Sequence, residues 1–578
     1  MKKVFLALMA IAAIALTGCK PKNGAYDEKA DCIVIGNVIT MDEANPSAEA
    51  VTVKNGLVQY VGSLDEARKY CDKNTVELDY GVASVYPGFI EGHVHGMEVA
   101  SRLTQLDLSK ISETEGFKMQ DFLDAISKYV KENPNLEVYK GAGWMITAGI
   151  PDPTRQMLDA ICDDRPMVFT SVDGHSMWIN TFAMKKYGVD NKENIRIFGK
   201  DCIHLENLTD SVPTGYISEA AMNLVRPALT LTKDEYKQML LQWQNIAFSY
   251  GITSALEAAL PIRGTYILEA FVELAKSGAW KLRTYASEAL QRYEKMEDIE
   301  EDVRIIKQHH DLLNSEYFKV YGIKIFMDGV VEAHTAWFNE PYADSASYYG
   351  VQAFPNPEGI TYAVAFSNSN NMNAHFHSIG DAATQTAVKA IIEAQNQTGI
   401  RDKRNTIAHL QVVRPEDIEL MGQNNIVAVV APLWTPAFSD YIGRERSFIG
   451  DRVDTQYPIK SFFDKGCCVT FHSDYPVSPN ISIPQTICTA VTRSYVPRQK
   501  ETEHTIAECV TREQALKALT VNVAYQLNEE NRLGKLKAGY VANMSVFDAD
   551  FLKDDLNKVF NAKTVATIVD GQVVYENK

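Results

Sequence analysis

Two histidines separated by one residue close an apolar run, Pro87-Gly88-Phe89-Ile90-Glu91-Gly92-His93-Val94-His95. Side chains two positions apart on a strand face the same side, so His93 and His95 would point into one space. Imidazole nitrogens are ligands for zinc, iron or nickel. A His-x-His pair alone is more often structural than metal-binding, so its meaning depends on the other groups that the fold brings to it.

Three later strand-like runs also end in residues that can bind a metal, namely His377, His409 and Asp474. In a parallel β/α barrel the carboxyl ends of all strands meet at one mouth, which is where barrel enzymes carry their active sites. We therefore expect these three side chains to converge with His93 and His95 on one point.

Lys324 lies within another such run, Gly322 to Met327, and its ammonium group would face the metal ions at the barrel mouth. Burial and nearby cations lower the pKa of a lysine. A neutral Lys324 amine could react with carbon dioxide to give a carbamate, an anion that can bridge two metals. The alternative is a charged lysine that forms a salt bridge.

Strand-like apolar runs alternate with amphipathic helical stretches through most of the chain, which predicts an α/β protein built on a TIM-type (β/α)8 barrel. The eight predicted barrel strands are Ser84 to Ile90, Thr253 to Glu257, Leu282 to Ser287, Gly322 to Met327, Met372 to His377, Thr406 to His409, Ile426 to Val430 and Val469 to Ser473.

The remaining segments predict two additions to the barrel, which itself should cover residues 84–530. Residues from about 100 to 250 are too many for one connection between a strand and a helix, so we expect an inserted α/β lobe there. Short β-rich runs with turn signals occupy residues 31–83 and 531–578, and we expect them to form one small β-sandwich from both chain ends.

The 578 residues carry a formal net charge of -17, and no basic run is long enough to bind a phosphate backbone, which argues against nucleic-acid binding. Eight cysteines beyond residue 19 show no CxxC spacing, and spacing alone assigns no disulfide.

Residues 1–19 predict an export signal: two lysines, an apolar stretch too short to span a bilayer, and then Leu16-Thr17-Gly18-Cys19. That tetrapeptide resembles the lipobox of bacterial lipoproteins, which implies lipidation of Cys19, residues 20–30 as a tether, and an exported protein anchored by lipid in the bacterial cell envelope. The alternative is an ordinary secretory signal with a chance cysteine.

Several motifs together resemble the amidohydrolase superfamily, and within it the branch of N-substituted formamide deformylases and exoenzyme-regulator-like proteins, amidohydrolase family 3. The matching segments are Pro87 to His95, Lys324 with Asp328-Gly329, Thr335-Ala336, Asp173-Gly174-His175-Ser176, His377 with Ile379-Gly380-Asp381, Ala408-His409-Leu410 and Ser473-Asp474-Tyr475-Pro476. The resemblance covers about residues 31–578.

The resemblance implies one or two divalent metal ions, with zinc as the expected metal. It implies that His93 and His95 bind the more buried ion and that His377 and His409 bind the more exposed one. Lys324, carbamylated, would bridge the two ions. Asp474 would ligate a metal and transfer the catalytic proton, taking it from the attacking water and giving it to the leaving nitrogen.

The pocket departs from the family pattern at Ala382, Ala431, His472 and His334, which places substrate preference in question more than metal binding. Asn543 replaces a further family aspartate in what we expect to be a structural turn. The residues expected to contact substrate are Asp173, His175, His334, Trp434 and His472.

Other polar residues near these motifs have structural interpretations. Asp173 and His175 could equally fix a loop by hydrogen bonding. His375, one layer deeper than His377, is more often a packed core residue than a ligand. Asp328 and Asp381, next to glycines, are expected to shape turns above the barrel.

The predicted activity is hydrolysis of a small molecule's non-peptide C–N bond, such as an N-formyl or N-acyl amine, by metal-activated water. Deamination or opening of a cyclic amide would use the same ligands. A surface lipoprotein that binds without catalysis is the alternative from another class. The oligomeric state is left open, and a dimer is compatible with the sequence.

Overall fold

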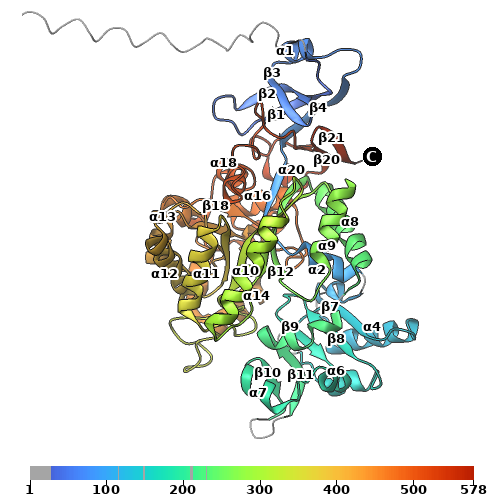
Figure 1. Cartoon of the computed structure of the whole chain (residues 1–578), viewed down its shortest axis with the longest axis vertical. Helices are drawn as coiled ribbons and strands as arrows, with labels where there is room; N and C mark the ends of the chain where they lie inside the picture. Colours follow the sequence, from blue (N-terminus) through green and yellow to red (C-terminus); the bar gives the residue numbers. More distant parts are fainter. Residues whose placement is uncertain are drawn as a thin grey trace, which may run out of the picture.

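The computed structural model describes residues 26, 28–103, 105–114, 116–146, 150–207, 212–229 and 231–577. Cys19 and the predicted signal segment lie outside these residues, so their prediction stays untested. Figure 1 shows three parts along the long axis: a sheet built from the two chain ends, a central barrel, and a lobe at the opposite end from the sheet.

The predicted parallel barrel is confirmed. Eight strands form one sheet in the order β18-β17-β16-β15-β14-β13-β12-β5, and neighbouring strands in it are all parallel. The barrel nearly closes where the backbone N–H of Asp474, just after β18, donates to the carbonyl of His93 in β5 at 3.3 Å. The strands are β5 (Phe89–Val94), β12 (Ile252–Pro261), β13 (Arg283–Ala289), β14 (Phe318–Phe326), β15 (Asn373–Ser378), β16 (Thr406–His409), β17 (Val427–Val430) and β18 (Val469–Phe471).

Helices connect successive strands and cover the outside of the barrel (Figure 1). Local sequence sets where they begin and end: Thr232 and Glu235 form a capping box at the start of α8, and Gly399 takes a left-handed conformation after α12. The main helices are α8 (Lys233–Ser249), α9 (Ile267–Ser277), α10 (Met296–Leu312), α11 (Pro357–Ser369), α12 (Asp381–Thr398), α13 (Pro415–Gln423), α14 (Ser439–Ile449), α15 (Ile459–Asp464), α16 (Ile483–Thr492), α18 (Arg512–Ala518) and α19 (Val521–Gln526).

The first barrel strand lies further along the chain than predicted. Residues 84–87 end β4 (Val76–Pro87), which belongs to another sheet, and the barrel strand β5 begins at Phe89. Both segments are apolar and buried, so hydrophobicity alone does not show where the chain passes from one sheet to the next.

The two chain ends form one mixed seven-stranded sheet, in the order β21-β20-β19-β4-β1-β2-β3. Antiparallel pairing of β4 with β19 joins the two halves of this sheet around a shared apolar core, and an isolated bridge between Leu57 and Val541 adds a second contact. The other six strands are β1 (Cys32–Ile39), β2 (Ser47–Lys54), β3 (Leu57–Gly62), β19 (Met544–Phe547), β20 (Thr564–Val569) and β21 (Gln572–Glu576). This sheet confirms that both ends contribute to one β structure.

Arg283 at the base of the barrel links it to this sheet. Its buried guanidinium group pairs with Asp570, bonds to Asn543 Oδ1 at 3.2 Å, and lies 3.1 Å from Glu316. Asn543, where the sequence departs from the family aspartate, is thus part of the structural contact, as expected for that turn.

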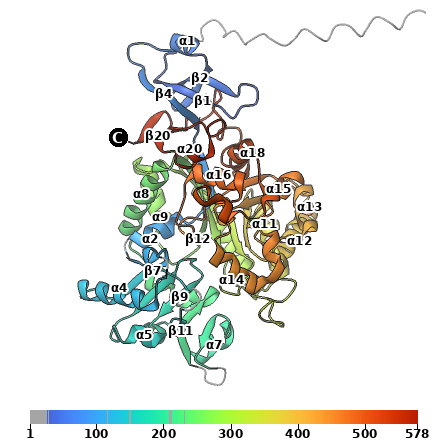
Figure 2. The same ribbon diagram turned by 180° about the vertical axis from the view of Figure 1, so that it is seen from behind.

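The inserted lobe contains a six-stranded sheet, in the order β10-β11-β9-β8-β7-β6 (Figure 2). Its strands are β6 (Leu106–Asp107), β7 (Tyr139–Trp144), β8 (Met167–Ser171), β9 (Ser176–Ile179), β10 (Ile203–Leu205) and β11 (Pro213–Ser218). Its helices include α4 (Met119–Glu132), α6 (Thr181–Lys186) and α7 (Lys192–Phe198). The lobe ends before α8, which packs on the barrel's own helices α2 (Gly96–Leu103) and α9.

All eight described cysteines are free thiols. In the part of the chain that the structure describes, no helix is both long and apolar enough to cross a membrane.

Candidate active site

The centre of the site is a cluster of three buried side chains, His93, His409 and Asp474. Each offers a ligand atom, and these atoms lie within 4.8 Å of one another, as required to hold a metal ion. His93 Nε2 is 3.1 Å from Asp474 Oδ1, and His409 Nδ1 is 4.0 Å from Asp474 Oδ2. Side chains from the first, sixth and eighth strands therefore meet at one point.

His95 and His377 border this cluster. His95 Nε2 lies 3.3 Å from both His93 Nε2 and Asp474 Oδ1. The ring of His377 lies 4.5 Å from that of His409, while its Nε2 is 3.0 Å from the carbonyl oxygen of Gly329. The predicted histidines are thus brought together, with His377 held to one side.

Backbone conformation at the strand ends helps to aim these ligands. His409 and Asp474 both adopt positive φ, 77° and 58°, where non-glycine residues are uncommon. His409 is the last residue of β16, Asp474 lies three residues after the end of β18, and each turns its side chain into the barrel mouth. Such strained residues concentrate at functional sites, where the surrounding structure holds them in place.

Lys324 is fully buried on β14, and among the described residues its Nζ has no hydrogen-bond partner. Burial lowers the pKa of this amine to about 7, against the opposing charge of Asp474. No salt bridge to Lys324 occurs within the described chain. The structure therefore favours a neutral amine over the salt-bridged alternative.

Burial keeps three of the histidines neutral, because it lowers the pKa values of His93, His377 and His409 well below the usual value. Burial also opposes the charge on His95, but the hydrogen bond with Asp474 raises the pKa of that residue. Burial alone would raise the pKa of Asp474, but the hydrogen bond with His95 and the charge of His409 lower it below its usual range. Neutral imidazoles beside an ionised carboxylate are the protonation states in which these groups bind a metal.

Buried polar atoms without partners lie in the same place. His409 Nδ1 and both ring nitrogens of His472 form no hydrogen bond within the described residues. Buried polar groups are rarely left unpaired unless they bind something else. Together with Lys324 Nζ, these atoms fit a site that holds one or two metal ions.

The layer beneath the cluster contains His375 and His472. His375 Nε2 lies 2.6 Å from His93 Nδ1, and its other nitrogen contacts Thr406 Oγ1, so this buried residue orients a ligand from behind. The ring of His472 is 5.0 Å from His93 and 5.2 Å from His409. His472, expected to contact substrate, lies instead among the metal-ligand candidates.

Asp328 ties together two loops above the barrel. Its carboxylate accepts hydrogen bonds from the backbone N–H groups of Trp337, Ile379 and Gly380, at 2.9, 3.0 and 2.7 Å. The expected turn-shaping role of Asp328 is confirmed.

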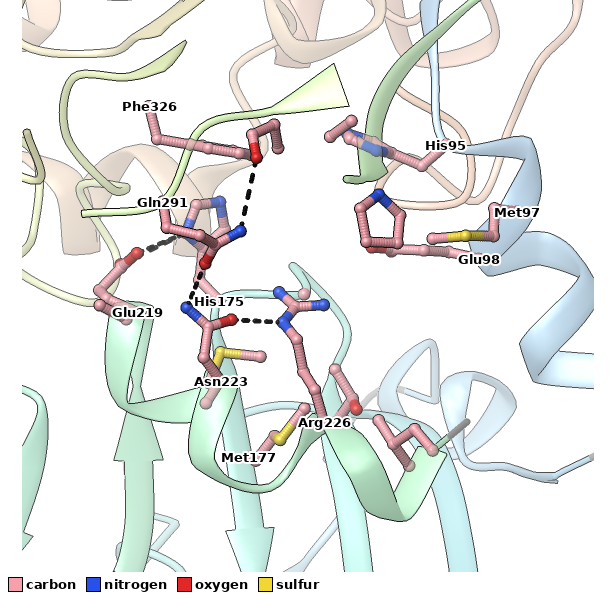
Figure 3. Close-up of a pocket in the computed structure, with 18 of the residues that line it drawn as sticks. His95, Met97, Glu98, His175, Met177, Glu219, Asn223, Arg226, Gln291 and Phe326 are labelled. Atoms are coloured by element: carbon pink, nitrogen blue, oxygen red, sulfur yellow. Dashed lines mark hydrogen bonds and ion pairs between the residues drawn. The ribbon is translucent and has the colours of Figure 1, made fainter. Parts of the chain in front are cut away.

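A cavity of about 650 Å³ opens above the cluster, between the barrel mouth and the lobe. His95, His377, His409 and Asp474 line its barrel side. Figure 3 shows the opposite side, where residues of the lobe face the barrel across the cavity.

Asp173 and His175 both line this cavity from the lobe. Asp173 also fixes its own loop, because Oδ1 accepts from Ser171 Oγ and from the backbone N–H of His175. His175 Nδ1 lies 3.2 Å from Glu219, and its ring is 5.3 Å from His377. Although burial opposes the charge, Glu219 raises the pKa of His175 to about 9.

Trp434 and His334, which were also expected to contact substrate, do not line the cavity. Trp434 stacks on the ring of His409 at 5.4 Å and donates from Nε1 to Ser478 Oγ at 2.6 Å, so it supports a ligand candidate. His334 pairs with Asp344 at 2.8 Å and contacts the ring of Phe448.

The cavity residues that were not predicted from the sequence include Glu219, Asn223, Arg226 and Gln291. Glu219 directly follows strand β11, and its positive φ of 50° turns it toward the barrel. The sequence around these residues has no metal-ligand spacing or catalytic motif that would have distinguished them from surface residues.

Curated relatives match the chain over nearly its whole length. The putative amidohydrolase YtcJ of Bacillus subtilis is 26% identical, over 94% of this chain and 98% of its own. The N-substituted formamide deformylase of Arthrobacter pascens is 22% identical over the same shares of the two chains.

Solved structures share the fold. An uncharacterized metal-dependent hydrolase from Pyrococcus horikoshii matches with a TM-score of 0.70 and 20% identity, over 91% of this chain and 99% of its own. Atrazine chlorohydrolase TrzN from Arthrobacter aurescens, complexed with zinc, matches with a TM-score of 0.51 and 13% identity, over 94% and 95% of the two chains.

The family model described as "Amidohydrolase family" matches residues 83–575, which include the barrel, the lobe and the C-terminal strands. This match covers well over half of the sequence and all of the cluster described above, so the chain belongs to the amidohydrolase family.

Proposed function

We propose that this protein is a metal-dependent hydrolase of a non-peptide C–N bond, such as that of an N-formyl or N-acyl amine. The observation that carries the proposal is the meeting of His93, His409 and Asp474 beneath a cavity of about 650 Å³, which the last two of them line. Family membership and the likeness to an N-substituted formamide deformylase support the choice of bond.

One or two divalent ions would be held by His93, His95, His377, His409 and Asp474, with a carbamate on Lys324 between them. Zinc is the proposed metal, since neutral imidazoles and a carboxylate are ligands that it accepts. When bound, such an ion acidifies water and polarises a carbonyl group. The unpaired, desolvated Nζ of Lys324 supports carbamylation.

Asp474 is proposed to move the proton. Its carboxylate is ionised, contacts His93 and His95 through Oδ1, and lines the cavity. It can therefore accept a proton from water on one side of the scissile bond and deliver it to the leaving nitrogen.

His175 is proposed to hold the substrate carbonyl. The pKa of about 9 keeps its imidazole protonated at neutral pH, with Glu219 at Nδ1 fixing the ring. The remaining N–H then faces the cavity beside His377 and can donate a hydrogen bond to an oxygen.

A product assay tests this function. Zinc-loaded protein is incubated with a panel of N-substituted formamides and N-acyl amines, and released formate, acid and ammonia are measured separately. Formate or acid with free amine is expected, and ammonia alone would point to a deaminase instead.

Variants locate the activity. His93→Ala and Asp474→Asn are expected to lower kcat/KM by about a thousandfold or more, because each removes a metal ligand or the proton carrier. His310→Gln on α10, away from the cavity, is the matched control and should retain activity. Full activity in His93→Ala would contradict the metal-dependent mechanism.

We further propose that the chain is exported and anchored by a lipid on Cys19. The lipobox-like segment Leu16-Thr17-Gly18-Cys19 supports this. In a bacterial host, wild type should fractionate with membranes and incorporate an alkyne-tagged fatty acid, while Cys19→Ala should do neither. Equal labelling of both forms would contradict lipidation at this residue.

A further inference from the structure

A series of hydrogen bonds runs along the cavity wall from the end of barrel strand β13 to Arg226 in the lobe. Gln291 Nε2 donates to the carbonyl of Ala289 at 3.5 Å, and Asn223 Nδ2 donates to Gln291 Oε1 at 2.7 Å. Asn223 Oδ1 then accepts from Arg226 Nε at 2.9 Å. Figure 3 shows this series ending with the Arg226 guanidinium group, which points into the cavity. This series of hydrogen bonds thus fixes the orientation of the guanidinium group.

Among the described residues, no carboxylate forms an ion pair with the guanidinium group. Within the described residues Arg226 forms no ion pair, and its two terminal nitrogens form no hydrogen bond. Glu219 is engaged by His175, and Asp173 by its own loop. Glu98 acts on Arg226 only through its charge. An oriented cation without a partner is unusual in a molecule of net charge -17.

Arg226 is exposed at the cavity wall, next to a part of the wall that is apolar. Its guanidinium group stays charged at any ordinary pH. Apolar side chains line the neighbouring part of the cavity, namely Met97, Met177, Met222, Leu229, Phe326 and Phe354. A hydrogen bond made to a charge in such surroundings is stronger than one made in open water.

We propose that the cavity accepts an amide whose far end carries a carboxylate, and that Arg226 binds this carboxylate through its two terminal nitrogens. The scissile bond would lie at the metal-ligand cluster, and the apolar wall would contact the carbon chain between the two ends. This inference rests on the proposed hydrolytic function and narrows its substrate class to anionic amides.

The planar fork of arginine suits this role, because two parallel N–H groups match the two oxygens of a carboxylate. A hydrogen bond to a charged group contributes about 1.5–3 kcal/mol, which corresponds to about 10- to 150-fold in binding. We therefore expect the protein to prefer an anionic amide over a neutral one of the same shape by about that factor in kcat/KM.

The test uses matched pairs of formamides. One series carries a terminal formylamino group on butanoate, hexanoate and octanoate, and the other has a hydroxyl group in place of the carboxylate. Hydrolysis of both series by the zinc-loaded full chain gives the preference for the anion. The carbon-chain length at which the preference is greatest indicates the distance between Arg226 and the reacting bond.

Three variants assign the preference to this residue. Arg226→Gln should abolish it, and Arg226→Lys should retain only part of it. Asn223→Asp should also abolish it, because the new carboxylate would pair with the guanidinium group from within. Lys192→Gln, which removes an exposed positive charge at the start of α7 in the same lobe, is the matched control and should leave the preference intact.

Calorimetric binding of the hexanoate compound to His93→Ala, with and without Arg226→Gln, separates this inference from the proposed function. Arg226-dependent binding without turnover in the wild type would support the carboxylate site and overturn the hydrolase. Turnover with equal rates for both series would support the hydrolase and overturn the carboxylate site. An equal loss of preference in Lys192→Gln would also overturn the carboxylate site.

Discussion

Several residues in this site have polar atoms that are buried away from water. Lys324, His409 and His472 all hold nitrogen atoms that are buried without a partner among the described residues. In a protein interior this arrangement costs free energy unless another group satisfies those atoms. The cost explains why a metal centre is the best account of the cluster.

Lys324 gives the sharpest test at this scale. Lys324→Met keeps the volume of the side chain but removes the nitrogen, so bound zinc per chain should fall by about half if the lysine bridges two ions. Because only the neutral amine can form a carbamate, metal content of the wild type should also fall as pH drops below about 7.

Elemental analysis of the purified proteins provides the measurement for this prediction. Lys389→Met, at an exposed position on α12, is the control for losing a lysine. Unchanged zinc content in Lys324→Met would remove Lys324 from the ligand set.

At the scale of elements, the loops above the barrel are tightly fitted. A Cβ at Gly380, just before α12, would lie 2.0 Å from the backbone oxygen of Trp337. The loops cannot separate easily there, because Asp328 binds the backbone of both Trp337 and Gly380.

Gly380→Ala should therefore lower the free energy of unfolding by about 1–3 kcal/mol, the usual cost of overpacking. Gly443→Ala is the matched control, since a Cβ at Gly443 in α14 meets no atom within 4 Å and has helical backbone around it. Chemical denaturation measures both, and equal stability of Gly380→Ala and wild type would contradict the predicted clash.

Part of the site could be predicted from the sequence and part could not, and the difference depends on which elements position each residue. His93, His409 and Asp474 could be brought together from sequence because strand ends of a parallel barrel meet at one mouth. Arg226 and Glu219 could not, because their position depends on how the lobe folds back over the barrel. The first barrel strand was placed too early, because the buried end of β4 and strand β5 form one continuous apolar run.

At the scale of the whole molecule, Arg283 connects the barrel to the terminal sheet. It is 3% exposed and pairs with Asp570 near the C-terminus. Removing one member of a buried ion pair leaves the other uncompensated, at a cost of about 3–5 kcal/mol. The partner here is partly exposed, so we expect Arg283→Leu to cost about 2–3 kcal/mol, at or just below the lower limit of that range.

Thermal and urea unfolding of Arg283→Leu measure this cost. Arg196→Leu breaks an ion pair of two exposed residues on α7 and should change stability by less than about 1 kcal/mol. Similar effects of the two changes would show that Arg283 contributes no more than a surface ion pair.

The pairing of β4 with β19 has a consequence for synthesis. Residues 32–87 leave the ribosome first, yet the strand that completes their sheet emerges only after the barrel and lobe have been translated. Strands β1 to β4 can pair with one another early, but β4 lacks its partner β19 until translation is nearly finished. A chain released early, or clipped near its carboxyl terminus, would expose the edge of β4 and be an early target for proteases and chaperones.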